Sequence, residues 1–93
     1  MATIAISGEL DAASVPARLR ESVQWFQSGQ STAIDLAGVT RADSAGIALL
    51  LEWLRRAHAA KADLSFHNPP PQMRAIIDFC ALGDVLPLND ADA

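Results

Sequence analysis

The segment RADSAGIALLL at residues 41–51 constrains the fold of this 93-residue chain more than any other. A strand-like run ends at the pair Asp43 and Ser44, and the apolar residues that follow have helical spacing. A serine hydroxyl is therefore expected at a helix N-terminus, where unpaired N–H groups and the helix dipole favour oxygen ligands and anions. From this position Ser44 can be a helix cap, a phosphorylation site or a contact with a partner, and the cap is the simplest of the three.

Composition excludes several classes of function. Hydrophobic residues make up 51% of the chain and charged residues 19%, which is typical of one folded domain. A net charge of −4 with only seven lysines and arginines argues against a nucleic-acid surface, because phosphate binding needs clustered basic side chains. There is one cysteine, the first residues have no secretion signal, and no apolar run approaches the roughly 20 residues of a membrane span. We therefore expect a cytoplasmic protein.

Strand and helix patterns alternate along the chain. Helical patterns begin at Pro16, at Ala45 and after the prolines at 69–71, and glycines end the first and third. This alternation predicts an α/β fold: a small, mixed or mostly parallel four-stranded sheet with about three amphipathic helices packed on it. We expect one domain over residues 1–88 and an acidic, frayed tail over residues 89–93. The expected strands are residues 3–6, 31–42, 62–67 and 84–88.

The central helix, expected over residues 45–60, carries two apolar stripes. Leu49 and Trp53 lie on the second stripe, away from the face expected to pack on the sheet, and continue from the Ser44 corner. Exposed side chains of this kind indicate a protein interface, unless a neighbouring loop or helix covers Trp53. The stripe expected to face the sheet is Ile47, Leu50, Leu51, Leu54 and His58.

The sequence has no recognisable catalytic or cofactor motif. Ser44 is not in a G-x-S-x-G elbow, and His58 and His67 are expected on a helix face and in a strand. The acidic residues have no metal-loop spacing, and there is no zinc-binding pair and no Gly-rich phosphate loop. We therefore predict no enzyme activity, no cofactor and no metal. Cys80 is predicted to be a small buried residue on the third helix, and Trp25 a partly buried aromatic.

Three segments together resemble the STAS domain family, the small α/β module of anti-sigma factor antagonists and sulfate-transporter tails. They are SGELD at 7–11, IDLAGV at 34–39 and ADSAGI at 42–47, and the resemblance extends over residues 3–88. It implies the STAS order of strands and helices. Many STAS domains begin with an additional strand that is nearly absent here, which leaves one sheet edge shorter or open.

Within the family, the helix after Ser44 and the ending LGDVLPL at 82–88 most resemble the MlaB group. This resemblance implies a non-catalytic subunit that binds and stabilises or activates the MlaF-like ATPase of a phospholipid-transport ABC complex, which also contains a permease and maintains outer-membrane lipid asymmetry. The chain would then lie at the inner membrane through its partner, without inserting into it. The implied partner-binding residues are Asp43, Ser44, Ala45, Gly46, Leu49 and Trp53.

The alternative within the same family is an anti-sigma factor antagonist. There, the serine that matches Ser44 is phosphorylated by an anti-sigma kinase, which adds roughly two negative charges. Many members carry a second serine where this chain has Ala45. An oligomerising scaffold, paired through the open sheet edge or the Trp53 stripe, is a third interpretation.

Overall fold

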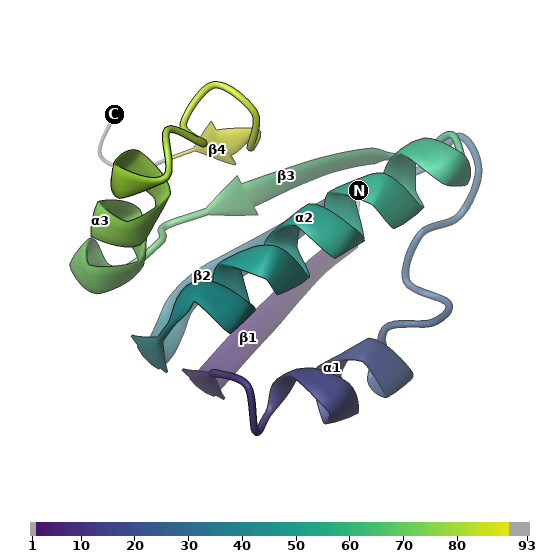
Figure 1. Cartoon of the computed structure of the whole chain (residues 1–93). Helices are drawn as coiled ribbons and strands as arrows, with labels where there is room; N and C mark the ends of the chain where they lie inside the picture. Colours follow the sequence, from purple (N-terminus) through teal and green to yellow (C-terminus); the bar gives the residue numbers. More distant parts are fainter. Residues whose placement is uncertain (1, 90–93) are drawn as a thin grey trace.

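Four parallel strands form one sheet in the order β1-β2-β3-β4, which is also their order along the chain (Figure 1). The computed structural model describes residues 2–89. The predicted α/β fold with a four-stranded sheet and three helices is confirmed, and the described sheet is entirely parallel. The elements are β1 (Ala2–Leu10), α1 (Val15–Glu21), β2 (Ser31–Ala42), α2 (Ser44–Ala59), β3 (Asp63–His67), α3 (Pro71–Phe79) and β4 (Leu88–Asn89).

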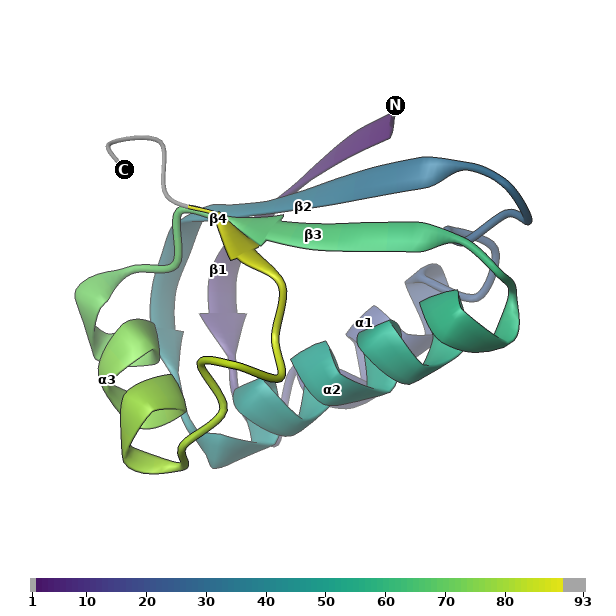
Figure 2. The same cartoon turned by 90° about the horizontal axis from the view of Figure 1, so that it is seen from above.

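The three helices lie on the same side of β2 and β3 (Figure 2). Alternate side chains of these strands, including Ile34, Leu36 and Phe66, are fully buried and form the core with α2. The intervening side chains include Asp35 and His67, which are half-buried and stand opposite each other in the β2–β3 register. Because β-strand side chains alternate between faces, this pattern assigns the apolar side of the sheet to the helix layer.

β1 is longer than the expected strand at residues 3–6, since it continues through Ser7 and Gly8 to Leu10. Its pairing with β2 shifts register twice, and at each shift β2 contains one additional residue. Gly8 has a φ of 83°, a conformation that glycine adopts without strain. Bulges of this kind bend a strand without ending it. The pairing continues past both register shifts, so Ser7 and Gly8 lie inside β1.

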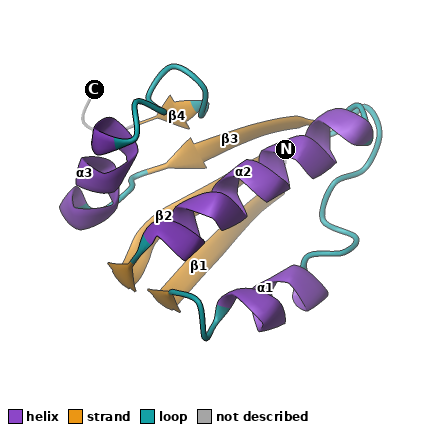
Figure 3. Cartoon of the chain, in the orientation of Figure 1, coloured by secondary structure: helices purple, strands orange, loops and turns teal. Residues whose placement is uncertain are grey.

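α1 is shorter than predicted. It ends at Glu21, and residues 22–30 form an irregular segment between α1 and β2 (Figure 3). The Ser22 hydroxyl donates a hydrogen bond to the carbonyl of Leu19 at 3.2 Å. A serine hydroxyl bonded to the preceding backbone in this way competes with continuation of a helix. The side chain of Val23, which follows this ending, is 69% exposed.

The C-terminal third departs from expectation at Cys80. α3 buries Met73 and Ile77, but it ends at Phe79, so the helical spacing that predicted a buried Cys80 no longer applies and the Cys80 side chain is exposed. β4 covers Leu88 and Asn89 only; the carbonyl of Pro87, just before it, accepts a hydrogen bond from Phe66 of β3 at 2.8 Å. Asn89, expected in the tail, therefore belongs to the sheet. Residues 90–93 of the predicted tail lie outside the described part of the chain.

Candidate functional site

The site predicted from the sequence is the corner between β2 and α2. β2 ends at Ala42, Asp43 has an extended backbone, and α2 begins at Ser44. The Asp43 carboxylate accepts hydrogen bonds from the backbone N–H groups of Ala45 and Gly46 at 2.9 and 3.3 Å. These are donors that lack acceptors within the helix, so Asp43 is the N-cap of α2. The simplest role considered for Ser44, that of the cap, is wrong.

Ser44 is the first residue of α2, and it is exposed. Among residues 2–89, no group hydrogen-bonds to its hydroxyl, because Asp43 already occupies the neighbouring N–H donors. The hydroxyl is thus placed at the positive end of a helix dipole and has no structural task there. An unengaged, exposed hydroxyl is chemically suited to modification by another protein.

Gly46 is buried and allows α2 to approach β1 very closely. A Cβ atom at this position would lie 2.3 Å from the carbonyl oxygen of Leu10, a distance that real Cβ atoms do not reach. The same carbonyl accepts a hydrogen bond from the N–H of Asp43 at 3.2 Å. These contacts hold the corner against the end of β1. Gly46 is therefore a packing residue, and the expectation that it contacts a partner directly does not fit its burial.

Leu49 and Trp53 are 2% and 0% exposed, so the prediction that they form an outward ridge is wrong. The Trp53 indole N–H donates a hydrogen bond to the buried hydroxyl of Ser22 at 2.9 Å. The rings of Trp53 and Trp25 pack together with their centroids 5.3 Å apart and tilted by 40°. The segment after α1 therefore covers this face of α2. This is the alternative considered for Trp53, in which a neighbouring loop or helix covers it. Trp25 is partly buried, as predicted.

α2 also departs from prediction on its other stripe. Ile47 and Leu50 are buried, whereas Leu51 and Leu54 are only half-buried and His58 is exposed. The helix is packed on two sides, by the sheet and by the segment after α1, so its buried arc is rotated toward Leu49 and Trp53.

A groove between α1 and α2 adjoins the corner, and the sequence did not reveal it. It encloses about 260 Å³, and we call it the α1–α2 groove. Ala45 and Ala48 of its wall follow Ser44 on α2, and Leu49 is the buried part of the same wall. Only the apolar spacing of α1 and α2 could have indicated it, and that spacing does not place two helices relative to each other. The lining residues are Val15, Leu19, Ala45, Ala48, Leu49 and Glu52.

Glu52, at one end of the groove, is held by two arginines. Its carboxylate accepts hydrogen bonds from Arg55 at 2.8 Å and from Arg56 at 3.0 Å. The hydrogen bond from Arg55, then that from Arg56, lowers the pKa of Glu52 to about 2. The carboxylate is therefore ionised near neutral pH, and its charge is already balanced by its neighbours.

The loop before α1 lies next to the corner and is held by reciprocal hydrogen bonds. The Asp11 carboxylate accepts from the Ser14 N–H at 2.9 Å, and the Ser14 hydroxyl accepts from the Asp11 N–H at 2.9 Å. The backbone hydrogen bond from Ser14 is the main cause that lowers the pKa of Asp11. This loop directly follows Leu10, whose carbonyl accepts a hydrogen bond from Asp43 and packs against Gly46.

The structure is that of a small parallel α/β domain with an unengaged hydroxyl at the start of a helix. Within residues 2–89 no group of three or more potential metal ligands comes together, and no helix is both long and apolar enough to cross a membrane. The family model described as "Mlab, STAS domain" matches residues 1–87. The chain belongs to the STAS domain family.

Two relatives specify the similarity further. The chain is 35% identical, over 82 residues, to the anti-sigma F factor antagonist of Lysinibacillus sphaericus, a match that covers 86% of this chain and 70% of that protein. It also resembles the solved structure of the anti-sigma factor antagonist SpoIIAA in its unphosphorylated form, with 28% identity and a TM-score of 0.74. This second match covers 96% of the chain and 77% of SpoIIAA.

These relatives overturn the function predicted first. Both are anti-sigma factor antagonists, which contradicts the prediction of an MlaB-like subunit bound to the ATPase of a phospholipid-transport ABC complex. The lipid-transport function and the ABC transporter partners inferred from that resemblance are therefore wrong.

Proposed function

We propose that the chain is an anti-sigma factor antagonist that binds an anti-sigma kinase and is released when that kinase phosphorylates Ser44. The observation that carries the proposal is the exposed Ser44 hydroxyl, which makes no hydrogen bond in the described part of the chain and stands at the first position of α2. The similarity to two anti-sigma factor antagonists, one of them solved in its unphosphorylated form, supports it. The proposed task is binding, not catalysis. Because the phosphoryl donor is ATP, the switch would operate in the cytoplasm.

Phosphorylation at Ser44 would change the charge of the surface without requiring a change of fold. A phosphoryl group brings about two negative charges, and the nearest helix N–H donors are already occupied by Asp43. The phosphate would therefore stay at the surface, next to a carboxylate. The positive end of the helix dipole stabilises an anion at this position by roughly 0.3–1 kcal/mol, so the domain remains folded.

The effect on binding follows from the same arrangement. In the unphosphorylated complex the partner is expected to bury the neutral Ser44 hydroxyl, which lies next to the Asp43 carboxylate. A phosphate in that position would be desolvated beside Asp43. Like-charge juxtaposition in an interface costs several kcal/mol, and each 1.4 kcal/mol is a tenfold loss of affinity. Release of the partner is the expected result.

The proposal is tested by incubating the chain with ATP and each purified anti-sigma kinase encoded in its source genome, followed by intact mass and peptide mapping. We expect one added phosphoryl group on the wild type, none on Ser44→Ala, and normal modification of Ser28→Ala, a matched change at another exposed serine. Titration calorimetry with the same kinase should show at least tenfold weaker binding for Ser44→Glu. Modification of Ser44→Ala at the wild-type rate, or an unmodified wild type, would overturn the proposal.

A further inference from the structure

The α1–α2 groove lies within the area that any kinase of Ser44 must cover. A stable interface buries about 800 Å² on each partner, which corresponds to a disc of about 16 Å radius. With a rise of 1.5 Å per helical residue, Ala48 and Glu52 lie only about 6 and 12 Å along α2 from Ser44. Ala48 is also four residues after Ser44, so both lie on the same face of the helix. The groove therefore opens beside the hydroxyl and inside the footprint.

Its size and lining suit a protein side chain. At about 260 Å³ the groove is smaller than the roughly 300–1,000 Å³ of small-molecule pockets. Five of its six lining residues are apolar, and the sixth, Glu52, is already bound by Arg55 and Arg56. No uncommitted polar group of the lining could orient a polar ligand. An apolar centre with charged residues at its edge is instead the usual anatomy of a protein interface.

We infer that the α1–α2 groove receives a large apolar side chain of the same anti-sigma kinase that phosphorylates Ser44. The inference rests on the proposed function and extends it, since it names a docking contact separate from the reacting hydroxyl. Leu49 forms the buried wall, Val15 and Leu19 form the facing wall on α1, and the small side chain of Ala48 leaves the entrance open. Burial of one leucine- or phenylalanine-sized side chain is worth about 10- to 100-fold in affinity.

Ala48→Gln tests the contact, because a glutamine at this exposed position fills the entrance with a polar side chain and adds no charge near Ser44. Ala59→Gln is the matched control: it is the same change at another exposed position of α2, about 22 Å along the helix from Ser44 and outside the footprint. Steady-state phosphorylation by the purified kinase should show KM at least tenfold higher for Ala48→Gln, with kcat within twofold. Ala59→Gln should stay within twofold of the wild type in both.

A second variant and three further outcomes keep the test decisive. Val15→Thr, which preserves shape and adds a hydroxyl on the facing wall, should raise KM about threefold with an unchanged circular dichroism spectrum. If the wild type is phosphorylated and Ala48→Gln has the KM of Ala59→Gln, the inference fails and the proposed function stands. If no kinase modifies the wild type, both fail. If light scattering shows a wild-type dimer that Ala48→Gln dissociates, the groove is occupied by a second copy and the inference is overturned.

Discussion

The hydrogen bond between Trp53 and Ser22 offers a sharp test of how α2 is held. Both side chains are fully buried, and the Ser22 hydroxyl accepts from the indole N–H at 2.9 Å. Ser22→Ala would leave that N–H buried without its acceptor, which costs about 1–3 kcal/mol. For a domain of this size each 1 kcal/mol lowers Tm by about 4–8 °C, so a loss of about 2 kcal/mol lowers Tm by about 8–16 °C.

A double-mutant cycle with Trp53→Phe isolates this hydrogen bond. The phenylalanine lacks the N–H donor and loses some apolar contact, for which we expect a cost of roughly 2 kcal/mol by itself. In that background Ser22→Ala should cost little, giving a coupling of about 1–2 kcal/mol between the two positions. Arg56 also approaches the Ser22 hydroxyl, at 3.5 Å, but this contact is present in both backgrounds and cancels in the cycle.

Urea denaturation followed by far-UV circular dichroism measures all four free energies of unfolding. The reasoning is refuted if Ser22→Ala costs less than about 0.5 kcal/mol, or the same amount with tryptophan and with phenylalanine at position 53. A further readout separates packing from binding. Because Trp53 is 0% exposed, Trp53→Phe should lower stability and leave the rate of Ser44 phosphorylation unchanged. A loss of phosphorylation without a loss of stability would indicate instead that Trp53 contacts the kinase.

Four further substitutions test the corner and the end of the groove. Asp43→Ala should lower the free energy of unfolding by about 1 kcal/mol, whereas Ser44→Ala should change it by less than about 0.5 kcal/mol, as measured in urea. Gly46→Ala should cost about 1–3 kcal/mol in the same assay, because its Cβ would lie 2.3 Å from the last carbonyl of β1; wild-type stability would contradict the close packing. Hydrogen bonds, the largest from Arg55, lower the pKa of Glu52 from its ordinary 4.5 to about 2, so the stability they provide is complete above pH 4.5 and is lost as the pH falls toward 2. The difference in urea midpoint between wild type and Glu52→Gln should follow that course, and a difference independent of pH would contradict it.

The sequence predicted the order of elements because local signals mark most of their ends. Proline marks the start of α1 and of α3, and the pair Asp43 and Ser44 marks the start of α2; each signal has a direct conformational cause. The end of α1 was missed because a serine hydroxyl bonded to the preceding backbone stops this helix, and Gly29 lies well beyond that point. β1 was predicted too short because a bulged parallel pairing has no signature in either strand alone.

The structure overturns two roles predicted for the candidate site, the Ser44 cap and the outward ridge of Leu49 and Trp53, for two physical reasons. α2 begins at Ser44 and not at Ala45, and this shift of one residue moves the cap from Ser44 to Asp43. Periodicity identifies side chains that share a helix face but not what covers that face. The cover over Trp53 is the irregular segment at residues 22–30, whose Trp25 was the available hint.

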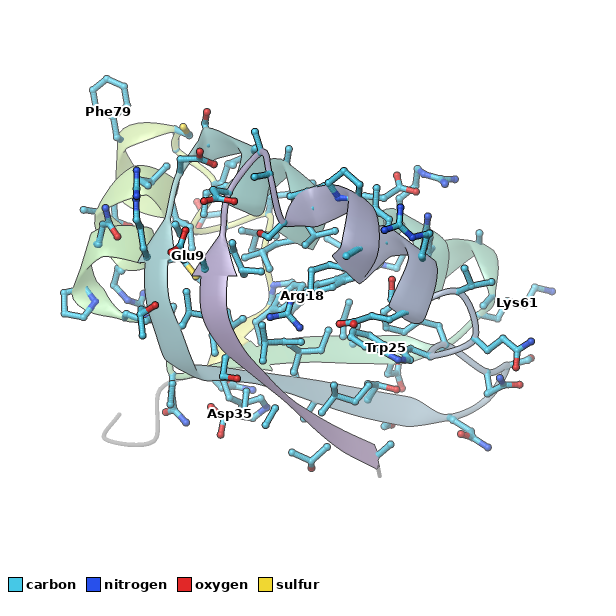
Figure 4. All side chains as sticks on the ribbon, turned by 90° about the horizontal axis from the view of Figure 1, so that it is seen from below. Glu9, Arg18, Trp25, Asp35, Lys61 and Phe79 are labelled. Carbon is cyan, nitrogen blue, oxygen red and sulfur yellow. The ribbon has the colours of Figure 1, made fainter. Side chains whose placement is uncertain are left out.

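The aromatic side chain of Phe79 does not belong to the core. Phe79, at the end of α3, is 91% exposed and projects away from the domain (Figure 4). Single exposed apolar residues are common on protein surfaces and need no special explanation.

The start of α2 is capped by Asp43 and not by Ser44, and this has an evolutionary consequence. With helix initiation assigned to Asp43, substitutions at position 44 carry almost no folding penalty. Serine, threonine or a permanently acidic residue can therefore occupy position 44 without loss of the fold. Under the proposed function, a threonine at position 44 would retune the switch and a permanently acidic residue would lock it, while the scaffold keeps its fold.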